Sequence, residues 1–520
     1  MTVNLSLYLV TDSTPEILGG RDLCSVVEQA VKGGVTVVQY RDKHSDTKAL
    51  IETAAKLHEI TLAHRIPLII NDRVDVALAV GAEGVHLGQD DMDIALAKTM
   101  MPEGTIVGAT VSSVEEARAA MESGADYLGI GTVYATPTKT NTKSIIGTAG
   151  VKRILKCVSS ISSKVGTVAI GGITLSNAQR VIYQSQATTK ALEGIAVVSA
   201  IMAADNPEAV AASFIRAVSR NPPFATFPIT PRENEESLLL NSVDALFKKV
   251  ATVHPLCHNM INYVVANFAA NIALAIGASP IMSGYGLEAS DLAKNNGALL
   301  INMGTLNGES MDNYLQGVRA YNEAGNPVVL DPVGAAATQL RRQSVKKLMQ
   351  EGYFDLIKGN ESEINYIYGR GQGHQVGVDS GPSTLDPKEK ATLVRNLAIR
   401  ERCIVLLTGS TDYLSDGART VAVHNGHQLL GQVTGTGCVI GTISAAFLAV
   451  ERKDKLLAVL SGLLMFEVAA ERAVSKGVNG PGSFVPALLD ELYSLRTQAT
   501  QSETPLDIIK NAAQLNFIHL

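Results

Sequence analysis

The sequence has few cysteines, and they follow no pattern. The five in the 520-residue chain are Cys24, Cys157, Cys257, Cys403 and Cys438. An odd number without a repeated spacing excludes the disulfide framework of small secreted domains, and it does not match a zinc site. We therefore expect reduced thiols and a cytoplasmic protein.

Charged residues and long apolar runs are also scarce. Charged residues make up 18% of the chain, the formal net charge is -6, and no basic block is long enough to bind nucleic acid. No apolar run reaches the roughly 20 residues that cross a membrane. The longest, Cys438–Val450, contains Thr and Ser. Residues 1–10 lack the basic region and the cleavage site of a signal peptide, so we expect a strand there. The sequence thus predicts neither a nucleic-acid partner nor a membrane partner.

Apolar residues, in contrast, make up 46% of the chain, which is enough for packed globular domains. The length predicts two to four domains. Residues 221–237 contain four prolines followed by acidic residues, a composition that cannot continue a helix and is typical of a semi-rigid linker. This linker separates residues 1–220 from residues 238–520, and both are reasonable sizes for domains.

Residues 1–220 alternate short apolar segments with helix-like ones such as Asp46–His64 and Ser113–Gly124. The apolar segments are rich in Val and Ile, as strands buried on both faces should be. They are Leu5–Thr11, Val35–Arg41, Pro67–Asp72, Gly84–Gly88, Ile106–Val111, Tyr127–Val133, Thr167–Ile173 and Gly194–Ala200. Eight strand–helix units predict a (β/α)8 TIM barrel, which carries its chemistry at the C-terminal strand ends.

Cations follow the second strand. Gln39, Arg41 and Lys43 alternate along the chain, so one amide and two positive charges share a face and can converge on an anion. Taken alone, this segment is more typical of a solvated strand end.

Carboxylates follow the third and fourth strands. Asn71 and Asp72 end the third, and Asp91 lies just after the fourth. Magnesium takes one or two carboxylates together with phosphate oxygens, so Asp72 and Asp91 are candidate magnesium ligands. Asp is also common at helix starts, which leaves a capping role as the alternative. We expect His86, inside the fourth strand, to be a hydrogen-bonded core residue and not a ligand.

The last three strands run into residues that suit a phosphate. Two hydroxyls and an ammonium follow the sixth strand, glycine follows the seventh, and a Val-Ser pair ends the eighth. These residues are Thr136, Thr138, Lys139, Gly172, Val198 and Ser199. Barrels often bind phosphate with the loops after strands seven and eight, through bare backbone amides. Together with the carboxylates and cations, such a mouth would suit the reaction of a diphosphate with a monophosphate.

The motifs of this half resemble those of thiamine phosphate synthase over nearly all of residues 1–220. The matching segments are Gln39–Lys43, Ile70–Asp72, His86–Asp91 and Tyr134–Lys139. The resemblance implies that hydroxymethylpyrimidine diphosphate loses pyrophosphate to give a pyrimidine-stabilised carbocation, which hydroxyethylthiazole phosphate then attacks. Such a reaction needs electrostatic help for the leaving group more than a general base.

The same resemblance assigns roles to individual residues. It implies catalytic roles for Arg41, Lys43 and Lys139, magnesium binding by Asp72 and Asp91, and substrate binding by Gln39, Asn71, Thr110, Thr136, Thr138, Gly172, Val198 and Ser199. Thr110 stands where the family often has Ser, and it keeps the hydroxyl.

Residues 238–520 also alternate strands and helices. The predicted strands are Ser279–Ser283, Ala298–Met303, Pro327–Pro332, Asp355–Lys358, Cys403–Thr408 and Thr420–His424. Helices are predicted at Asn259–Ile276 and Val439–Val450, and a turn at Asp412–Ala418 indicates a hairpin. We therefore expect an α/β sandwich around a mixed sheet, and not a second barrel.

The strongest motif of this half is Val433–Cys438, in which Gly435 and Gly437 precede an apolar helix. Glycines there let successive N–H groups point at one anion, such as a phosphate, and a plain glycine-capped turn is the alternative. Gly369–Gly381 is also Gly-rich, but it lacks the Gly-Lys-Ser/Thr ending of a P-loop.

Carboxylates again follow strands in this half. Asp331 ends one strand, and Asn360 and Glu363 follow another. If a helix begins at Asn360, the two residues share a face, where Glu363 could hold a magnesium–water network or could merely cap the helix.

These features resemble hydroxyethylthiazole kinase, of the ribokinase-like fold, over about residues 240–500. Further matching segments are Pro255–Asn259, Gly277–Met282, Asn302–Leu306 and Gly480–Phe484. The resemblance implies ATP-dependent phosphorylation of the thiazole alcohol. It places Met282 at the thiazole, Asn262, Lys358, Thr408, Gly435 and Gly437 at ATP, Asp331 and Glu363 at magnesium and the phosphates, and Cys438 at the catalytic position.

Two of these positions differ from the residues that the family or related sugar kinases often have there. Lys358 stands where the family often has Arg, and it keeps the charge but not the bidentate fork. Cys438 stands where related sugar kinases have an Asp base. A buried thiol is a poor base unless its pKa falls, although a helix N-terminus can lower it. Because phosphoryl transfer depends mainly on positioning and charge stabilisation, we expect Cys438 to assist by its location.

Together the two halves resemble the bifunctional thiamine biosynthesis enzymes of fungi. That resemblance implies Mg2+ as cofactor, ATP as co-substrate, small-molecule partners, and a homo-oligomer, a hexamer by analogy with kinase trimers and synthase dimers. A catalytically inactive pathway sensor or scaffold is the alternative. The charged residues such a protein would lose first are all present, namely Arg41, Asp72, Asp91, Lys139, Asp331 and Glu363.

Overall fold

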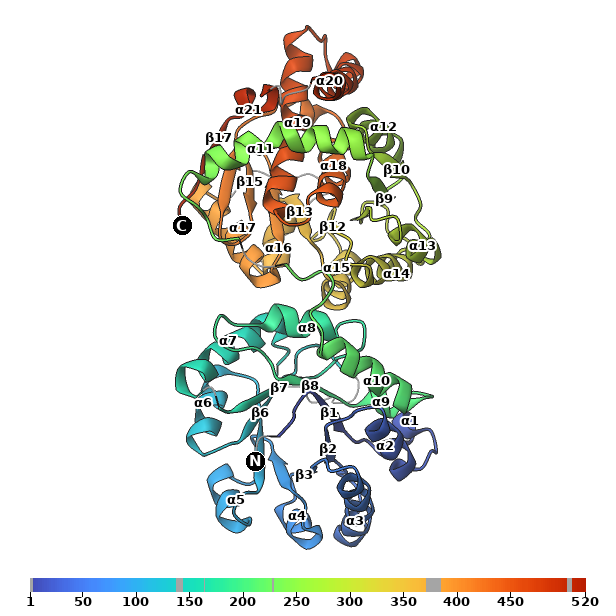
Figure 1. Ribbon diagram of the computed structural model, residues 1–520, viewed down its shortest axis with the longest axis vertical. Coiled ribbons are helices and arrows are strands. Elements are labelled where there is room, and N and C mark those ends of the chain that lie inside the picture. The colour runs from blue at the N-terminus through green and yellow to red at the C-terminus, as the bar shows by residue number, and fades with distance from the viewer. Residues whose placement is uncertain (1–2, 137–143, 163, 227–228, 371–384, 503–506) are drawn as a thin grey trace. The chain divides into compact units, whose positions relative to one another are not determined.

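The computed structural model describes residues 3–136, 144–162, 164–226, 229–370, 385–502 and 507–520 (Figure 1). The chain divides into two compact units, Met1–Pro222 and Pro223–Leu520. None of the helices in the described ranges combines the length and the hydropathy needed to span a bilayer.

The first unit is a closed barrel of parallel strands that pair in sequence order. The strands are β1 Leu7–Val10, β2 Val37–Tyr40, β3 Leu68–Asn71, β4 Gly84–Leu87, β5 Ile106–Val111, β6 Tyr127–Ile130, β7 Gly166–Ile170 and β8 Gly194–Val197. The helices are α1 Pro15–Leu18, α2 Leu23–Lys32, α3 Thr47–Ala63, α4 Val74–Val80, α5 Ile94–Met100, α6 Val114–Glu122, α7 Gly147–Ile161, α8 Ala178–Ser185, α9 Ser199–Met202 and α10 Pro207–Val218. The predicted (β/α)8 barrel is confirmed, with helices ringing the strands in Figure 1.

Side chains of the barrel strands alternate between two cores. Leu7 and Leu9 of β1 belong to the core between strands and helices. Tyr8 belongs to a smaller cluster inside the barrel, together with Tyr127 of β6. Room for these rings comes from glycine on a neighbouring strand, because a Cβ at Gly108 would lie 2.1 Å from the Tyr127 ring. The barrel interior is therefore filled by side chains up to the mouth.

Several strands end earlier than the sequence predicted. β6 stops at Ile130, three residues before Val133, and β7 stops at Ile170, three before Ile173. Val133 and Ile173 are nevertheless buried. These apolar residues belong to loops that pack into the core. A prediction based on hydrophobic runs cannot distinguish such loops from strands.

The second unit is built on a nine-stranded sheet in the order β10-β9-β11-β12-β13-β14-β15-β16-β17. Its strands are β9 Leu256–Met260, β10 Ser279–Ile281, β11 Ala298–Asn302, β12 Val328–Asp331, β13 Leu356–Asn360, β14 Ile404–Thr408, β15 Asp412–Ser415, β16 Thr420–Val423 and β17 Leu515–Phe517. Strands β9 to β14 are parallel, and β15 to β17 add antiparallel pairs. The expected mixed sheet is confirmed.

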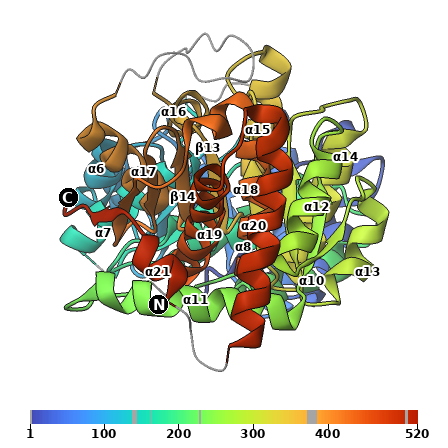
Figure 2. The ribbon, with the colours of Figure 1, turned by 90° about the horizontal axis from the view of Figure 1, so that it is seen from above.

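Helices cover both faces of this sheet. Leu300 of β11 packs on Gly441, and its neighbour Leu299 packs on Gly317, so α18 and α14 lie on opposite faces. Helices α18, α19 and α20 lie side by side with α11 across them (Figures 1 and 2). The helices are α11 Glu235–Val253, α12 Ala266–Ile276, α13 Ala289–Ala293, α14 Ser310–Glu323, α15 Gln339–Glu351, α16 Glu361–Tyr368, α17 Pro387–Glu401, α18 Thr436–Val450, α19 Lys455–Ser475, α20 Pro481–Gln501 and α21 Ile508–Ala512.

Two predictions for this unit were wrong in part. Asn259, predicted as the start of a helix, lies in β9, and α12 begins only at Ala266. Because β9 contains polar residues, its hydrophobic pattern did not predict a strand, yet those polar groups form hydrogen bonds inside the protein. The Asn259 amide bonds to Cys257 O and to Thr442 Oγ1 at 2.8 Å each. The segment Asp412–Ala418 was predicted as a turn, but its first part, Asp412–Ser415, forms strand β15.

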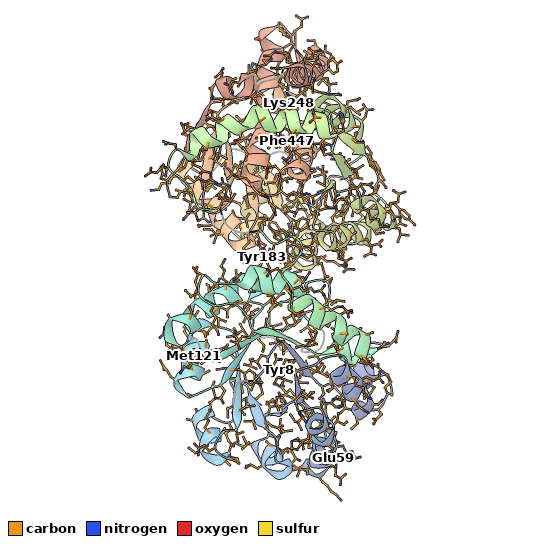
Figure 3. The ribbon with its side chains drawn as sticks, in the orientation of Figure 1. Tyr8, Glu59, Met121, Tyr183, Lys248 and Phe447 are labelled. Atoms are coloured by element: carbon orange, nitrogen blue, oxygen red, sulfur yellow. The ribbon has the colours of Figure 1, made fainter. Side chains whose placement is uncertain are left out.

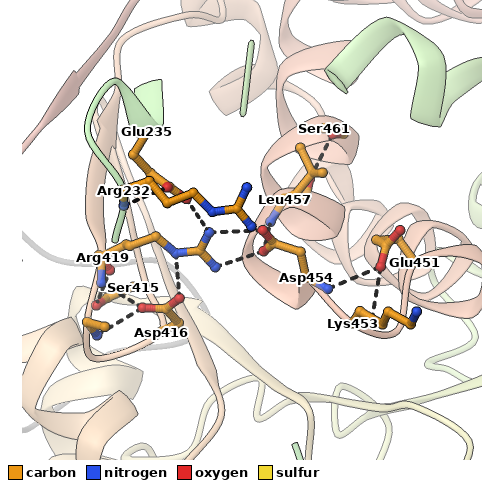
Figure 4. A network of polar contacts seen from close by, with 11 residues as sticks. Arg232, Glu235, Ser415, Asp416, Arg419, Glu451, Lys453, Asp454, Leu457 and Ser461 are labelled. Carbon is orange, nitrogen blue, oxygen red and sulfur yellow. Dashed lines mark hydrogen bonds and ion pairs between the residues drawn. The ribbon is translucent and has the colours of Figure 1, made fainter. Parts of the chain in front are cut away.

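A buried arginine holds three separated segments of this unit together (Figure 4). The Arg419 side chain is 2% exposed and pairs with Asp416 after β15, with Glu235 at the start of α11, and with Asp454 before α19, each at 2.7 Å. Although burial disfavours its charge, the hydrogen bond to Asp454 and the neighbouring carboxylates raise the pKa of Arg419. The arginine thereby anchors the N-terminal helix of the unit to the sheet.

We expect Arg419→Met to destabilise the second unit by about 3–5 kcal/mol, because it leaves three partly buried carboxylates without their counter-charge. Denaturant unfolding followed by far-UV circular dichroism measures the loss. The matched control is Arg319→Met, which breaks the more exposed pair with Glu351 and should cost less than about 1 kcal/mol. Equal losses in the two variants would contradict a special role for Arg419.

Candidate active sites

A cavity of about 410 Å³ opens at the C-terminal ends of the barrel strands. Six predicted site residues line it, namely Arg41, Lys43, Asn71, Asp72, Asp91 and Thr110. They lie at the ends of four strands, β2 to β5, or in the loops that follow them, so the barrel brings together residues up to about 70 positions apart. The cavity also exposes residues that sequence reasoning did not select, among them Ser112, Glu116 and Thr132.

The acidic side of this cavity holds two neighbouring carboxylates. Lys43 Nζ lies 3.0 Å from Asp72 Oδ2, and the Gly88 amide donates to Asp91 Oδ2 at 2.6 Å. Partial burial and the adjacent Asp72 raise the pKa of Asp91. Neither Asp72 nor Asp91 is a helix N-cap, because the N-cap residue of α4 is Arg73 and that of α5 is Asp93.

Asp72 is held in an unusual backbone conformation, with φ at +62°. This left-handed region is uncommon for residues other than glycine, although Asp tolerates it better than most. Two adjacent carboxylates beside an open cavity suit Mg2+, because the ion completes its coordination with phosphate oxygens and water. The residues present therefore fit a magnesium ion.

The loops after β6, β7 and β8 hold the remaining residues predicted for the barrel site. Gly171 and Gly172 adopt left-handed φ values of +104° and +64°. A Cβ at Gly172 would lie 2.8 Å from the Ala135 carbonyl oxygen, so this close approach requires glycine. Thr136 ends the described part of the β6 loop, and Thr138 and Lys139 lie outside the described residues. Val198 is the N-cap of α9, and Ser199 is its first residue.

Gln39 and His86 lie inside the barrel. Gln39 is buried, and its Nε2 donates to the Tyr8 hydroxyl at 2.8 Å. His86 is also buried; its Nδ1 lies 2.9 Å from the Tyr127 hydroxyl and its Nε2 lies 2.8 Å from Thr110 Oγ1. His86 is thus the hydrogen-bonded core residue that the sequence predicted, and it also reaches the cavity wall.

The second unit gathers its polar residues at the C-terminal ends of neighbouring parallel strands. Asn302 ends β11, Asp331 ends β12, Asn360 ends β13 and Thr408 ends β14. Met282 follows β10 directly. In open α/β sheets this edge is where ligands bind.

A buried ion pair lies at the centre of this edge. Lys358 Nζ is 3.0 Å from Asp331 Oδ1, and the two side chains are 4% and 1% exposed. Although burial disfavours the ammonium charge, Asp331, Cys438 and Glu363 raise the pKa of Lys358. Lys358 is therefore held as a cation.

Asn302 connects this ion pair to the next predicted site residue. Its Nδ2 donates to Asp331 Oδ2 at 2.8 Å, and its Oδ1 accepts from Asn262 Nδ2 at 2.9 Å. Asn262 Nδ2 also lies 3.8 Å from Cys438 Sγ. Sequence reasoning did not select Asn302 as a site residue, although a polar residue that ends a buried apolar strand was an available signal.

Glu363 forms the capping arrangement that the sequence left open. It makes a reciprocal capping box with Asn360 at the start of α16. Its Oε2 accepts from the Asn360 amide and its Oε1 from the Gly334 amide, each at 2.8 Å. Burial and the nearby Asp331 raise the pKa of Glu363 to about 7. Each oxygen keeps one lone pair, which suits a metal-bound water better than direct coordination of a metal.

The Gly435–Cys438 segment opens α18. Gly435 is the N-cap, with φ at +95°, and a Cβ there would lie 2.3 Å from Val265 Cγ1. Cys438 is the third helical residue. Burial and Asp331 raise the pKa of its thiol to about 11, so the helix N-terminus does not lower it. Cys438 is consequently a neutral thiol at physiological pH.

Comparisons with known proteins match each unit separately and then the whole chain. Residues 7–201 match a family model described as thiamine monophosphate synthase, and residues 247–498 match the hydroxyethylthiazole kinase family. The chain is 41% identical over 504 residues to a probable thiamine biosynthetic bifunctional enzyme of Schizosaccharomyces pombe, covering 95% of each protein. It is 35% identical over 537 residues to a thiamine biosynthetic bifunctional enzyme of Saccharomyces cerevisiae, covering 95% of this chain and 96% of that protein. The solved hydroxyethylthiazole kinase of Pyrococcus horikoshii is 36% identical, with 53% of this chain and 99% of that chain covered and a TM-score of 0.46.

Proposed function

The chain belongs to the family of thiamine biosynthetic bifunctional enzymes, and we propose that it catalyses two consecutive reactions. The second unit phosphorylates the alcohol of 4-methyl-5-(2-hydroxyethyl)thiazole with ATP. The barrel joins the resulting phosphate to 4-amino-5-hydroxymethyl-2-methylpyrimidine diphosphate, giving thiamine phosphate and pyrophosphate. The observation that carries this proposal is the similarity to bifunctional enzymes over nearly the whole chain. The comparisons do not support a catalytically inactive sensor or scaffold.

In the barrel we propose that the cationic side of the cavity binds the diphosphate. Arg41 and Lys43 line the cavity together with Asn71. Departure of pyrophosphate leaves negative charge on the leaving group, and fixed cations lower the energy of that state more than a general base would. The family resemblance also supports a role for Lys139 in the same charge stabilisation. It likewise supports roles for Thr136 and Thr138 at the thiazole phosphate.

We propose Asp72 and Asp91 as the residues that hold Mg2+ in the barrel. When bound, the ion supplies neutralisation of the diphosphate charge. Lys43 orients Asp72 through their 3.0 Å contact. The Gly88 amide orients Asp91. Gly172 follows β7, and Val198 and Ser199 follow β8; we propose that their backbone binds the monophosphate.

In the second unit we propose that ATP lies along the C-terminal strand ends. Lys358, Asn262 and Thr408 would contact the nucleotide, and Gly435 and Gly437 would offer amides to the transferred phosphoryl group. Asp331 and Glu363 would organise Mg2+ and its waters, and Met282 would contact the thiazole. Cys438 lies next to Asn262 and Asp331 as a neutral thiol, which suits a role in packing the substrate alcohol in line with the phosphate.

We propose that copies of this chain associate through the edge of the second unit. Large apolar side chains after β9 and β10 are exposed, with Tyr263 at 79%, Val264 at 75% and Leu287 at 65%. β9 and β10 are adjacent parallel strands, and Met282 directly follows β10. Such a cluster is typical of a protein interface. An assembly of kinase trimers and synthase dimers would give a hexamer.

We further propose that the enzyme works in the cytoplasm. All five cysteines are free thiols, which is the state that a reducing compartment maintains. Small molecules, ATP among them, are its proposed partners.

Two isosteric variants test whether the reactions use separate sites. Asp72→Asn should lower synthase kcat/KM at least about 100-fold and leave kinase kcat/KM within about twofold, because it removes a magnesium ligand of the barrel alone. Glu363→Gln should do the reverse. Both assays are run on one purified full-length chain, with circular dichroism as the folding control. Loss of both activities from either well-folded variant would contradict independent sites.

Cys438→Ala should retain part of the kinase activity, with kcat lowered by roughly tenfold. Since the pKa of the thiol is raised to about 11, a thiolate base would make kcat rise about tenfold per pH unit between pH 7 and 10. A positional role predicts parallel pH profiles for the wild type and the variant. Complete inactivity of a folded variant that binds ATP would contradict a positional role. A kcat that rises with pH in the wild type but not in the variant would contradict it as well.

Leu287→Arg should weaken self-association and lower kinase activity at low protein concentration, because it buries an unpaired charge in the interface. Light scattering coupled to size-exclusion chromatography measures the mass. The matched control is Leu340→Arg, which alters an equally exposed leucine of α15. If both variants have the wild-type mass, the proposed interface is wrong.

A further inference from the structure

One arginine joins the two loops that follow β11 and β12. Arg341 lies in the first turn of α15, which packs beside α14 on the face of the sheet opposite to α18; Figure 3 labels Phe447 of α18. Its Nη1 donates to Met303 O and to Val333 O at 2.6 Å each, and its Nη2 donates to Gly304 O at 2.8 Å. The guanidinium group therefore bonds to main-chain carbonyls of both loops at the C-terminal edge of the sheet.

The Val333 carbonyl is one side of a peptide group whose other side holds a predicted site residue. The N–H of the same peptide group belongs to Gly334, and it donates to Glu363 Oε1 at 2.8 Å. In a trans peptide the C=O and the N–H point in opposite directions, so a donor held at the oxygen also fixes the direction of the N–H. Arg341 therefore acts on Glu363 through one peptide group.

The loop after β11 repeats this arrangement. Met303 O accepts from Arg341, and the N–H of the same peptide group, that of Gly304, donates to Asn302 Oδ1 at 3.0 Å. The Asn302 amide in turn donates to Asp331 Oδ2 at 2.8 Å. One guanidinium group thus orients a hydrogen-bond donor on each of the two loops.

Both of these peptide groups, which we call the clamped peptides, precede a glycine. Glycine populates positive and negative φ about equally, so a peptide group before glycine can turn over at little steric cost. Gly334 has φ at +69°, and a Cβ at Gly304 would lie 2.6 Å from Asn262 Cβ, so a larger residue is strained at either position. A turned peptide would direct a carbonyl oxygen, instead of an N–H, at Glu363 or at Asn302 Oδ1. A donor that holds the two oxygens prevents this reversal.

The neighbouring arginine makes a similar contact without reaching the site. Arg342 Nη1 donates to Ala336 O at 2.7 Å. The N–H of that peptide group belongs to Ala337, and it donates to Gly334 O at 2.9 Å within the same turn. Arg342 is half-buried, as Arg341 is, but the peptide group that it holds bonds on its other side to the turn and not to a site residue. Arg342 is therefore a matched control.

We propose that Arg341 is a positioning residue of the kinase site: by holding the clamped peptides, it fixes the Asn302 and Glu363 side chains beside the phosphates of the nucleotide. This inference rests on the proposed kinase activity and adds to it a residue that acts through others. Its three bonds use the planar fork of a guanidinium group, which a lysine ammonium does not reproduce.

The first test is kinetic and uses the full-length chain. Arg341→Met should lower kinase kcat roughly 10- to 100-fold and raise KM for ATP-Mg at least about threefold, because displaced side chains misplace the phosphates. KM for the thiazole alcohol and synthase kcat/KM should stay within about twofold. Arg342→Met should leave all of these constants within about twofold. Equal losses in the two variants, or a lower kcat with KM for ATP-Mg unchanged, would overturn the positioning role, since both results are those of a smaller folded fraction.

The second test needs no substrate. Crystal structures of the ligand-free wild type and of Arg341→Met report the direction of each clamped peptide. The wild type should show the three Arg341 contacts. In the variant, the Gly334 N–H should no longer donate to Glu363, or the Gly304 N–H should no longer donate to Asn302. Both bonds still shorter than about 3.2 Å in the variant would overturn the proposal.

A second variant covers a failure to fold, which far-UV circular dichroism detects. If Arg341→Met does not fold, Arg341→Lys keeps the charge and the apolar stem, and it should lower kinase kcat roughly three- to tenfold and raise KM for ATP-Mg. Wild-type constants in that variant would then overturn the proposal. A wild-type chain without kinase turnover would refute the proposed function, whereas the crystal structures would still decide whether Arg341 holds the clamped peptides.

Discussion

Both units depend on one constraint, which is that parallel strands covered by helices are buried on both faces. Their backbone groups pair within the sheet and their side chains must be apolar, so polar residues collect where the strands end. In the barrel this edge carries Asn71, Asp72 and Asp91 around the cavity. In the second unit it carries Asn302, Asp331 and Thr408. The position of the chemistry thus follows from the position of the apolar strands.

Burial also decides how the site residues are held. An unpaired charge or hydroxyl inside the protein costs several kcal/mol, so each must have a partner. Asp331 has Lys358 and Asn302, and Glu363 has two backbone amides. These contacts leave the groups few alternative positions, which suits reactions that depend on preorganised charge.

The two proposed reactions handle phosphate in opposite ways. The second unit would add a phosphoryl group to an alcohol, using a buried cation and helix amides but no strong base, as the neutral Cys438 thiol indicates. The barrel would expel pyrophosphate, with cations and a metal at the leaving group. Hydroxyethylthiazole phosphate would be the product of the second unit and a substrate of the first, so the order of the units in the chain is opposite to the order of the reactions.

The sequence by itself determined the two-part organisation, the (β/α)8 barrel, the mixed sheet and the strand ends that carry charge. These features are local, because hydrophobic period and turn residues are read within a few neighbouring positions. The tertiary structure decided what depends on distant partners. β9 is a strand although its polar residues do not look like one, because Thr442 of α18 satisfies Asn259. Asn302 joins Asn262 to Asp331 across three strands, and Gln39 is linked to Thr110 through three buried rings. No local pattern encodes such links, since each residue's role is set by the groups that folding places beside it.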